Sequence, residues 1–166
     1  MEYNKEHMAK VYGDSLPISP KKAMEMCQYI RNKSLSWAKQ NIQAIIEKKQ
    51  AMPFTRFNRG LGHRRNIGPG RYPITTAKEM MKLLNALEAN AQFKGLDTNS
   101  LVIVQSIANR AGTVWHHGRQ RRRVMKRAHV ELIVEEKKEL KKEKKEEPKE
   151  KKSAEKKLQK KTGEKK

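Results

Sequence analysis

The stretch that decides the fold is Leu101–Val134, LVIVQSIANRAGTVWHHGRQRRRVMKRAHVELIV. Its first seven residues are rich in Val and Ile, and from Ala128 onward apolar and polar side chains alternate, as in a strand with one buried face. We therefore predict two strands, Leu101–Ile107 and Ala128–Val134, that pair antiparallel. The residues between them are rich in arginine and histidine and too many for a short turn.

This long connection predicts a hairpin that protrudes from the body. If the strands continue to about Thr113 and return from about Val124, each arm measures roughly 35 to 40 Å at about 3.3 Å per residue. A compact domain of this size has a radius of gyration of only about 14 Å. The protruding part offers few apolar side chains for burial, and a free two-stranded arm is marginally stable in water. An arginine-rich arm should therefore become ordered against an anionic surface.

Two helices are predicted before residue 53. The first has Ser19 as its N-cap and a proline at the first helical position, and apolar residues recur at three-and-four spacing until about Asn32. The second begins at Ser34 or Ser36 and ends before Pro53, because the residue preceding a proline disfavours the helical region. Each helix would bury one apolar face.

A third helix has the strongest helical pattern. Thr76 and Glu79 have the spacing of a capping box, an apolar face repeats through Ala91, and Gly95 offers a left-handed stop. A weaker alternating pattern at Ala9–Leu16 predicts an amino-terminal strand. The order of one strand, three helices and two strands predicts an α+β domain, with the three helices packed on one face of a small three-stranded antiparallel sheet.

The chain carries a large excess of positive charge. Of its 166 residues, 39 are Lys or Arg and 18 are Asp or Glu, which gives a net charge of +21. Nucleic acid is the first candidate partner, because each phosphate that a cation neutralises releases condensed counterions. A membrane surface is the second, but no apolar run approaches the roughly 20 residues that span a bilayer, and no apolar signal segment appears at the amino terminus.

The last thirty residues differ from the rest of the chain. Lys137–Lys166 contains fifteen lysines and seven glutamates but only two leucines and one alanine, too little apolar surface to offset the entropy of ordering. We predict a folded domain at 1–136 and a disordered lysine-rich tail at 137–166. The tail has a net charge of +8, which leaves +13 on residues 1–136, so the domain is itself basic.

Two long windows in the folded part contain basic residues and no acid. One lies between Glu47 and Glu79 and includes a basic insertion loop at about 53–73, and the other lies between Asp97 and Glu131 and includes the hairpin. A merely solvated loop would intersperse glutamate, as the tail does. Arginine offers a planar fork to phosphate, and aromatic or histidine rings stack on unpaired bases. The predicted RNA-binding residues, two of them on the first helix, are Lys21, Lys22, Arg56, Arg59, Arg64, Arg65, Arg71, Arg110, Trp115, His116, His117, Arg119, Arg121, Arg122, Arg123, Lys126 and Arg127.

Other chemistries have little support in the sequence. Gly60–Gly70 lacks the Gly-Lys-Ser/Thr ending of a phosphate loop and a preceding hydrophobic strand, so we expect an irregular basic loop. His116 and His117 could act as a nuclease acid and base, but no carboxylate lies near them in sequence. Cys27, the single cysteine, falls on the apolar face of its helix, and the five histidines lack zinc-ligand spacing. We expect no catalytic site, no metal and no cofactor.

Four runs of sequence resemble one family, the universal large-subunit ribosomal protein twenty-two, called protein seventeen in eukaryotes. These runs occur in the family's order between about Val11 and Glu136. They are ISPKKA at 18–23, QAMPFTRFN at 50–58, NALEANA at 85–91 and HVELIVE at 129–135. The insertion between the second and third helices is similar to that of archaeal and eukaryotic members, because bacterial members connect these helices by a short turn.

The resemblance implies a structural protein of the large ribosomal subunit in the cytoplasm, and not an enzyme. Its body would lie on the outer surface of the subunit near the peptide exit, and its hairpin would reach inward through ribosomal RNA and aid assembly. Implied partners are large-subunit ribosomal RNA, neighbouring ribosomal proteins and the nascent polypeptide. We expect no membrane span and no homo-oligomer. The tip that lines the exit tunnel would comprise His117, Gly118, Arg119, Gln120 and Arg121, with arginines where the family has alanine and methionine.

Two other functions stay open at this point. A DNA-binding or nucleic-acid-compacting protein built on the first two helices would place its arginines on a helix, whereas here they lie in loops and in the hairpin. A ribonuclease would depend on His117 and on partners that the fold brings to it. The leading prediction is RNA binding, in which the body makes phosphate contacts and the hairpin threads between RNA elements.

Overall fold

The computed structural model describes residues 7–137. The predicted tail, apart from Lys137, lies outside the described residues, so the division into a domain at 1–136 and a tail stays a prediction. The described elements, in chain order, are β1 (Met8–Leu16), α1 (Pro20–Ile30), α2 (Leu35–Ile46), β2 (Met52–Pro53), β3 (His63–Arg64), β4 (Gly68–Arg71), α3 (Ile74–Phe93), β5 (Leu101–Arg110), β6 (Val114–Trp115), the 3-10 helix η1 (Gly118–Gln120), β7 (Val124–Met125) and β8 (Ala128–Glu136).

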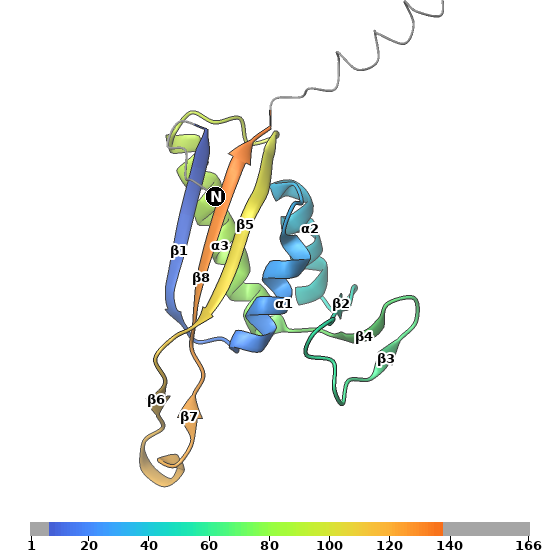
Figure 1. Cartoon of the computed structure of the whole chain (residues 1–166), viewed down its shortest axis with the longest axis vertical. Helices are drawn as coiled ribbons and strands as arrows, with labels where there is room; N and C mark the ends of the chain where they lie inside the picture. Colours follow the sequence, from blue (N-terminus) through green and yellow to red (C-terminus); the bar gives the residue numbers. More distant parts are fainter. Residues whose placement is uncertain (1–6, 138–166) are drawn as a thin grey trace, which may run out of the picture. The chain divides into compact units, whose positions relative to one another are not determined.

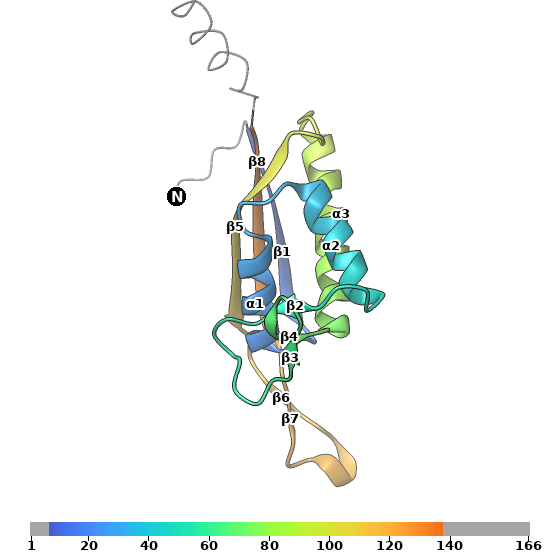
Figure 2. The ribbon, with the colours of Figure 1, turned by 90° about the vertical axis from the view of Figure 1, so that its right-hand side faces the viewer.

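The main sheet has the strand order β1-β8-β5, and both neighbouring pairs are antiparallel. Figures 1 and 2 show α1, α2 and α3 to one side of this sheet, and none of the helices within residues 7–137 lies on its other face. Met8 lies opposite Glu135, so β1 starts where β8 ends, and the connection from β5 to β8 leaves from the other end of the sheet. The predicted α+β arrangement and the pairing of the two carboxyl-terminal strands are confirmed.

Contacts from the helical layer partly close both edges of this sheet. Along β5, the Asn32 N–H donates to the Ile103 carbonyl (2.8 Å), and the Ile103 N–H donates to the Lys33 carbonyl (2.9 Å). Beside β1, the side-chain amide of Asn90 on α3 donates to the Lys10 carbonyl (3.0 Å). These bonds reduce the number of backbone groups that another chain could pair with.

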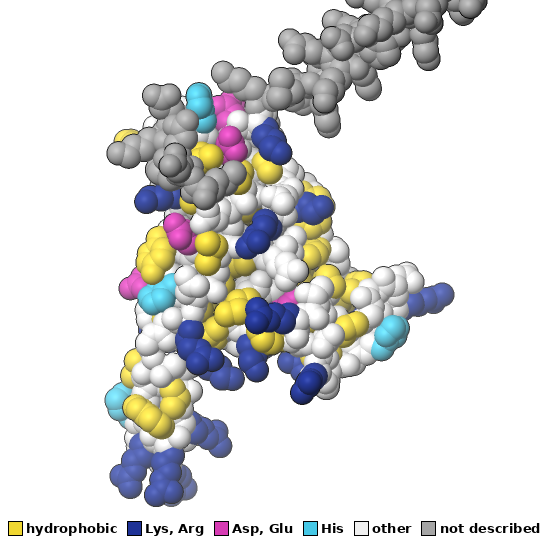
Figure 3. Space-filling view, in the orientation of Figure 1, with side chains coloured by type: hydrophobic (Ala, Val, Ile, Leu, Met, Phe, Trp, Pro, Cys, Tyr) yellow, Lys and Arg dark blue, Asp and Glu magenta, His cyan; other side chains and the backbone are white. Residues whose placement is uncertain are grey.

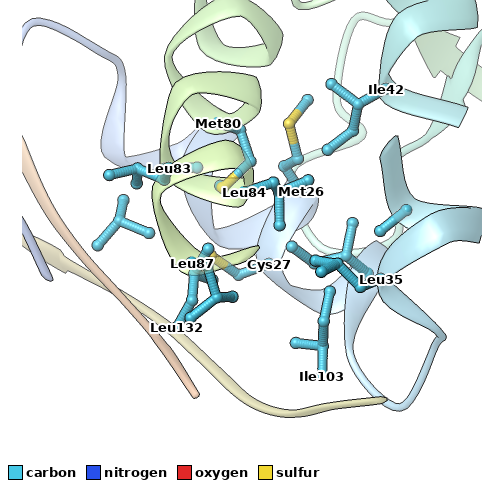
Figure 4. Packing of buried hydrophobic residues seen from close by; sticks show 14 of the residues in the cluster. Met26, Cys27, Leu35, Ile42, Met80, Leu83, Leu84, Leu87, Ile103 and Leu132 are labelled. Carbon is cyan, nitrogen blue, oxygen red and sulfur yellow. The ribbon is translucent and has the colours of Figure 1, made fainter. Parts of the chain in front are cut away.

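The hydrophobic core lies between the sheet and the helices. Its members come from the apolar faces that the sequence periodicity predicts. Those labelled in Figure 4 are Met26, Cys27, Leu35, Ile42, Met80, Leu83, Leu84, Leu87, Ile103 and Leu132. Full burial of a Leu, Ile or Met side chain contributes about 1.5–3 kcal/mol. This cluster therefore provides the main driving force that holds the helices on the sheet.

One helix start differs from the sequence prediction. Helix α3 begins directly after Pro73, and Thr76 is a buried residue within it, so the predicted capping box of Thr76 and Glu79 is wrong. The proline has a fixed φ suited to helix entry, which lets the helix begin earlier. Glu79 instead forms an ion pair with Lys82. The predicted left-handed stop is confirmed, because Gly95 has a φ of +73° just after the helix ends.

The first testable expectation concerns the core. Leu87 on α3 is fully buried, and we expect Leu87→Ala to lower the free energy of unfolding by about 2–5 kcal/mol, because a cavity replaces packed methyl groups. Phe93 on the same helix is 95% exposed, so the control Phe93→Ala should change it by less than about 0.5 kcal/mol. Urea denaturation followed by circular dichroism measures both, and equal losses would contradict the packing described.

Candidate nucleic-acid interface

A buried carboxylate holds the start of the insertion against α1. Glu25 is only 3% exposed. Its oxygens accept hydrogen bonds from the backbone N–H groups of Thr55 (3.1 Å), Arg56 (2.8 Å) and Phe57 (2.9 Å), and from the Thr55 hydroxyl (3.2 Å). Because three consecutive backbone donors converge on one side chain, the path of this segment across α1 is fixed.

These hydrogen bonds also determine the charge of Glu25. Burial by itself raises the pKa of this carboxyl, but the N–H groups of Thr55, Phe57 and Arg56 stabilise the charged form and together hold its pKa below the ordinary value of 4.5. Glu25 is therefore ionised at neutral pH. A buried anion bound in this way loses its partners only if the insertion leaves the helix.

An open groove of about 590 Å³ lies where α1, the insertion and the base of the hairpin meet. We call it the basic groove. It is lined by Ser19, Lys21, Lys22, Phe54, Arg56, Phe57, Asn58, Arg59, Arg71 and Lys126. Six of these side chains are cationic and none is acidic. Dark blue side chains gather in this lower part of the body in Figure 3. Their mutual repulsion would be relieved by a bound anion.

Phe57 adds an aromatic surface to the basic groove. The ammonium nitrogen of Lys21 lies 5.5 Å from the centroid of its ring, and the guanidinium carbon of Arg56 also lies 5.5 Å from it. The ring is half-buried. An aromatic ring flanked by cations can stack on an unpaired base while the cations bind the adjoining phosphates.

The insertion is more regular than the predicted irregular loop. Strands β2, β4 and β3 form a small antiparallel sheet in that order. Gly70 permits β2 and β3 to lie close to β4, because a Cβ at this position would lie 3.3 Å from the Met52 carbonyl oxygen and 3.2 Å from Cγ of Arg64. The Arg64 guanidinium lies over the ring of Tyr72, 5.4 Å from its centroid. Arg65, in the turn after β3, is exposed.

The hairpin protrudes from the body as predicted, although its ladder is interrupted (Figure 1). Strands β5 and β8 pair as far as Arg110 and Ala128, and regular pairing resumes only between β6 and β7. The expected continuous arms are thus broken at 111–113 and 126–127. Gly112, Thr113 and Lys126 at this break are exposed. They offer no apolar pair that would stabilise a strand there.

The far end of the hairpin, which we call the arm (residues 112–126), has almost no core of its own. Val114, Trp115 and Val124 are 45%, 59% and 39% exposed. Gly118 turns the chain with a φ of +64°. The cations of the tip surround a hollow of about 540 Å³ that is lined by Arg119, Gln120, Arg121, Arg122 and Arg123. The arm therefore presents charge and one large aromatic ring, Trp115, outward.

The structure places the predicted RNA-binding residues other than Arg127 in four regions. Six of them meet in the basic groove, namely Lys21, Lys22, Arg56, Arg59, Arg71 and Lys126. Arg64 and Arg65 lie on the insertion, and Arg110 lies exposed at the end of β5. The arm carries Trp115, His116, His117, Arg119, Arg121, Arg122 and Arg123, of which His116 alone is half-buried. Their contacts with RNA stay predictions.

Arg127 has a different environment from the other predicted residues. It is half-buried at the base of the hairpin, where its guanidinium donates to the Ser15 carbonyl at the end of β1 (3.1 Å), and its backbone carbonyl accepts from the Ala111 N–H (3.1 Å). These bonds tie the hairpin base to the neighbouring strand. Arg127 is therefore placed to hold the base of the hairpin and so to orient the arm.

Sequence reasoning missed Glu25. A single acid beside Lys21 and Lys22 looks like a surface ion-pair partner, yet Glu25 is buried. A signal was available, because Glu25 is the only acid between Asp14 and Glu47 and stands in the apolar run AMEMC at 23–27. Which donors it binds depends on residues thirty positions later, and no local pattern specifies them.

The described residues also include the single cysteine and the side-chain types that can ligate a metal ion. Burial raises the pKa of the Cys27 thiol to about 11, so this side chain is uncharged at neutral pH and packs as a core residue. Within residues 7–137, no group of three or more His, Cys, Asp or Glu side chains could hold a metal ion. None of the helices in that range is long and apolar enough to cross a bilayer.

Comparison with known proteins gives one consistent result. A family model described as Ribosomal protein L22p/L17e matches residues 11–135. Proteins named large ribosomal subunit protein uL22 are similar over most of their length. That of Methanococcoides burtonii is 42% identical over 123 residues, 74% of this chain and 81% of that protein. That of Ignicoccus hospitalis is 38% identical over 146 residues, 81% of this chain and 92% of that protein. That of Nanoarchaeum equitans is 38% identical over 144 residues, 81% of this chain and 82% of that protein.

The role of Glu25 leads to a pH-dependent expectation. Glu25→Gln should lower the free energy of unfolding at pH 7 by about 2–3 kcal/mol, because its amide N–H₂ would face backbone N–H donors. Folding lowers the pKa of Glu25, so its contribution is present above the ordinary value of 4.5 and is lost as the pH falls through the folded-state value. The two proteins should therefore converge in stability below pH 4.5. Chemical denaturation at stepped pH measures this.

Glu79→Gln is the matched control for this expectation. It removes an ion pair with Lys82 on the surface of α3, and it should change the free energy of unfolding by no more than about 1 kcal/mol at pH 7. A stability gap between the wild type and Glu25→Gln that stays constant into acid would show that Glu25 is not held as a carboxylate.

Proposed function

The chain belongs to the ribosomal protein L22p/L17e family, in its archaeal-type branch, and on this premise we propose that it binds ribosomal RNA as a structural part of the large ribosomal subunit. The family is one of structural proteins, so the chain is not an enzyme, and its place is the ribosome in the cytoplasm. The proposal includes two finer roles: the protein aids subunit assembly, and the tip of the arm lines the tunnel of the nascent polypeptide.

The basic groove is the observation that carries RNA binding. Six cations from four separate segments of the chain line the groove together with Phe57, without an acid among them. A nucleic-acid backbone that enters the groove would neutralise Lys21, Lys22 and Arg71 at once, and an unpaired base could stack on the Phe57 ring. Single-stranded loops and bulges of a folded RNA present this combination of accessible phosphates and unstacked bases.

The arm supports the finer roles. Its exposed apolar residues and its cluster of arginines make it unstable as a free ribbon, so RNA that surrounds it would neutralise the charge and cover Trp115. The body and the arm would then contact RNA elements on both sides of the break at 111–113 and hold them together during assembly. A tip threaded through RNA in this way can reach an interior passage such as the nascent-chain tunnel.

The alternative of a DNA-binding protein built on α1 and α2 has less support. A helix that reads the major groove needs free polar or cationic side chains along one face. Helix α2, LSWAKQNIQAII, contains a single cation, Lys39, and it forms an ion pair with Glu88 of α3. Apart from Arg31, the arginines of the chain lie in the insertion and in the hairpin.

The groove proposal predicts a specific decrease in RNA affinity. Lys21→Gln combined with Lys22→Gln should weaken binding to a fragment of large-subunit ribosomal RNA and lower the slope of log K against log salt by about 0.7–0.9 for each phosphate that the variant no longer neutralises. Filter binding or anisotropy across a salt series measures both quantities. The control, Lys78→Gln with Lys82→Gln on the exposed surface of α3, removes the same charge and should leave the slope nearly unchanged. If both double variants lowered the RNA affinity and the salt slope equally, binding would depend on net charge and not on the groove.

The arm proposal predicts separable effects on folding and assembly. Deletion of Gly112–Val124 keeps the hydrogen bond between Ala111 and Arg127, so the body should fold with nearly unchanged thermal stability. In cells that depend on this variant, sucrose gradients should show a deficit of mature large subunits. An unfolded deletion protein, or a gradient profile identical to the wild type, would contradict the proposed role of the arm.

A further inference from the structure

The face of the main sheet that is turned away from the helices differs in charge from the basic groove and the arm. In β8, Val130, Leu132 and Val134 are fully buried and face the helices. The residues that alternate with them lie on the opposite face, where His129, Glu131 and Glu135 are half-buried and Ile133 is buried. The outward positions of β1, β8 and β5 carry three carboxylates, Asp14, Glu131 and Glu135, against one lysine, Lys10. In Figure 3, most of the magenta side chains in view lie over this sheet, while the arm shows dark blue.

The centre of this face is a row of three residues on adjacent strands. Tyr12 lies opposite Glu131, and Glu131 lies opposite Ile107. Residues paired in this way project their side chains side by side from the same face of a sheet. Within residues 7–137, no Lys or His side chain forms an ion pair with Glu131. An unpaired carboxylate thus lies between an aromatic ring and an aliphatic side chain.

The aromatic ring of this row is both exposed and held in place. Tyr12 is 59% exposed. It stacks on the imidazole of His129, with the ring centroids 5.8 Å apart and an angle of 14° between the planes. Nδ1 of His129 lies 2.6 Å from the Asp14 carboxylate. A positioned aromatic ring loses little conformational entropy when a partner covers it, which is typical of residues at the centre of interfaces.

We propose that this sheet face binds an arginine-rich segment of a neighbouring ribosomal protein. A guanidinium group can pair with the Glu131 carboxylate through its planar fork and stack on the Tyr12 ring at the same time, which a compact ammonium group does less well. Phosphate would be repelled by the three carboxylates, so RNA is the less suitable occupant. The inference rests on the proposed place of the chain in the large subunit and adds a protein partner to a face that the RNA-binding residues do not use.

Photo-crosslinking in assembled subunits tests this inference. Large subunits are prepared with the full chain carrying p-benzoylphenylalanine in place of Tyr12 or, separately, in place of Phe57. After irradiation, the Tyr12 probe should give an adduct that resists ribonuclease and maps by mass spectrometry to an arginine-rich protein segment. Adding Glu131→Arg should lower the yield of that adduct about tenfold through like-charge repulsion. The matched reversal Glu79→Arg on α3 should leave the yield unchanged.

The two probes separate this inference from the proposed RNA binding. The Phe57 probe should give an RNA adduct, and its failure would count against the basic groove whatever the Tyr12 probe does. With the Phe57 adduct present, three results at the Tyr12 position would overturn the inference: an RNA adduct, an adduct to a segment without arginines, or no adduct. A yield unaffected by Glu131→Arg would likewise overturn it.

Discussion

The interface depends on one interaction, the set of hydrogen bonds between the Glu25 carboxylate and three consecutive backbone N–H groups at 55–57. A carboxylate this deeply buried is stable only when such donors surround it, and the insertion follows a defined path only while the carboxylate binds it. The acid therefore organises a surface that contains only basic side chains among its charged groups. Without this anchor, Arg56 and Phe57 would belong to a loop with no fixed relation to Lys21 and Lys22.

Much of the fold follows from local sequence because burial imposes local periodicity. The alternation in β8 and the apolar face of α3 each indicate which side of the element packs against the core. The sheet, the helices and the hairpin could therefore be predicted. Capping was predicted less well: the spacing of Thr76 and Glu79 suggested a cap, but Pro73 set the start of α3. The small sheet in the insertion was not predictable, because Gly68–Arg71 has low strand propensity and is paired by β2 and β3.

The candidate site was predictable as a set of residues and not as a surface. Cations in acid-free windows are visible in sequence, but the convergence of Lys21, Arg71 and Lys126 on one groove depends on tertiary packing. Arg127 illustrates the same difference, since its bond to Ser15 gives it a structural environment that its sequence neighbours lack. The acidic sheet face was hidden for a related reason: Tyr12 and Glu131 are far apart in sequence and meet only through strand pairing.

The register of β1 on β8 has a practical consequence. Met8 faces Glu135, and the Glu136 N–H donates to the His7 carbonyl (3.1 Å), so both described ends of the chain leave the body together, at the end of the sheet remote from the hairpin. A fluorescent label attached to the side chain of residue 7 or 137 would be kept away from the groove and from the arm. The same geometry makes a circular permutation of residues 7–137 feasible, with new termini opened in the arm and residues 7 and 137 joined by a short linker.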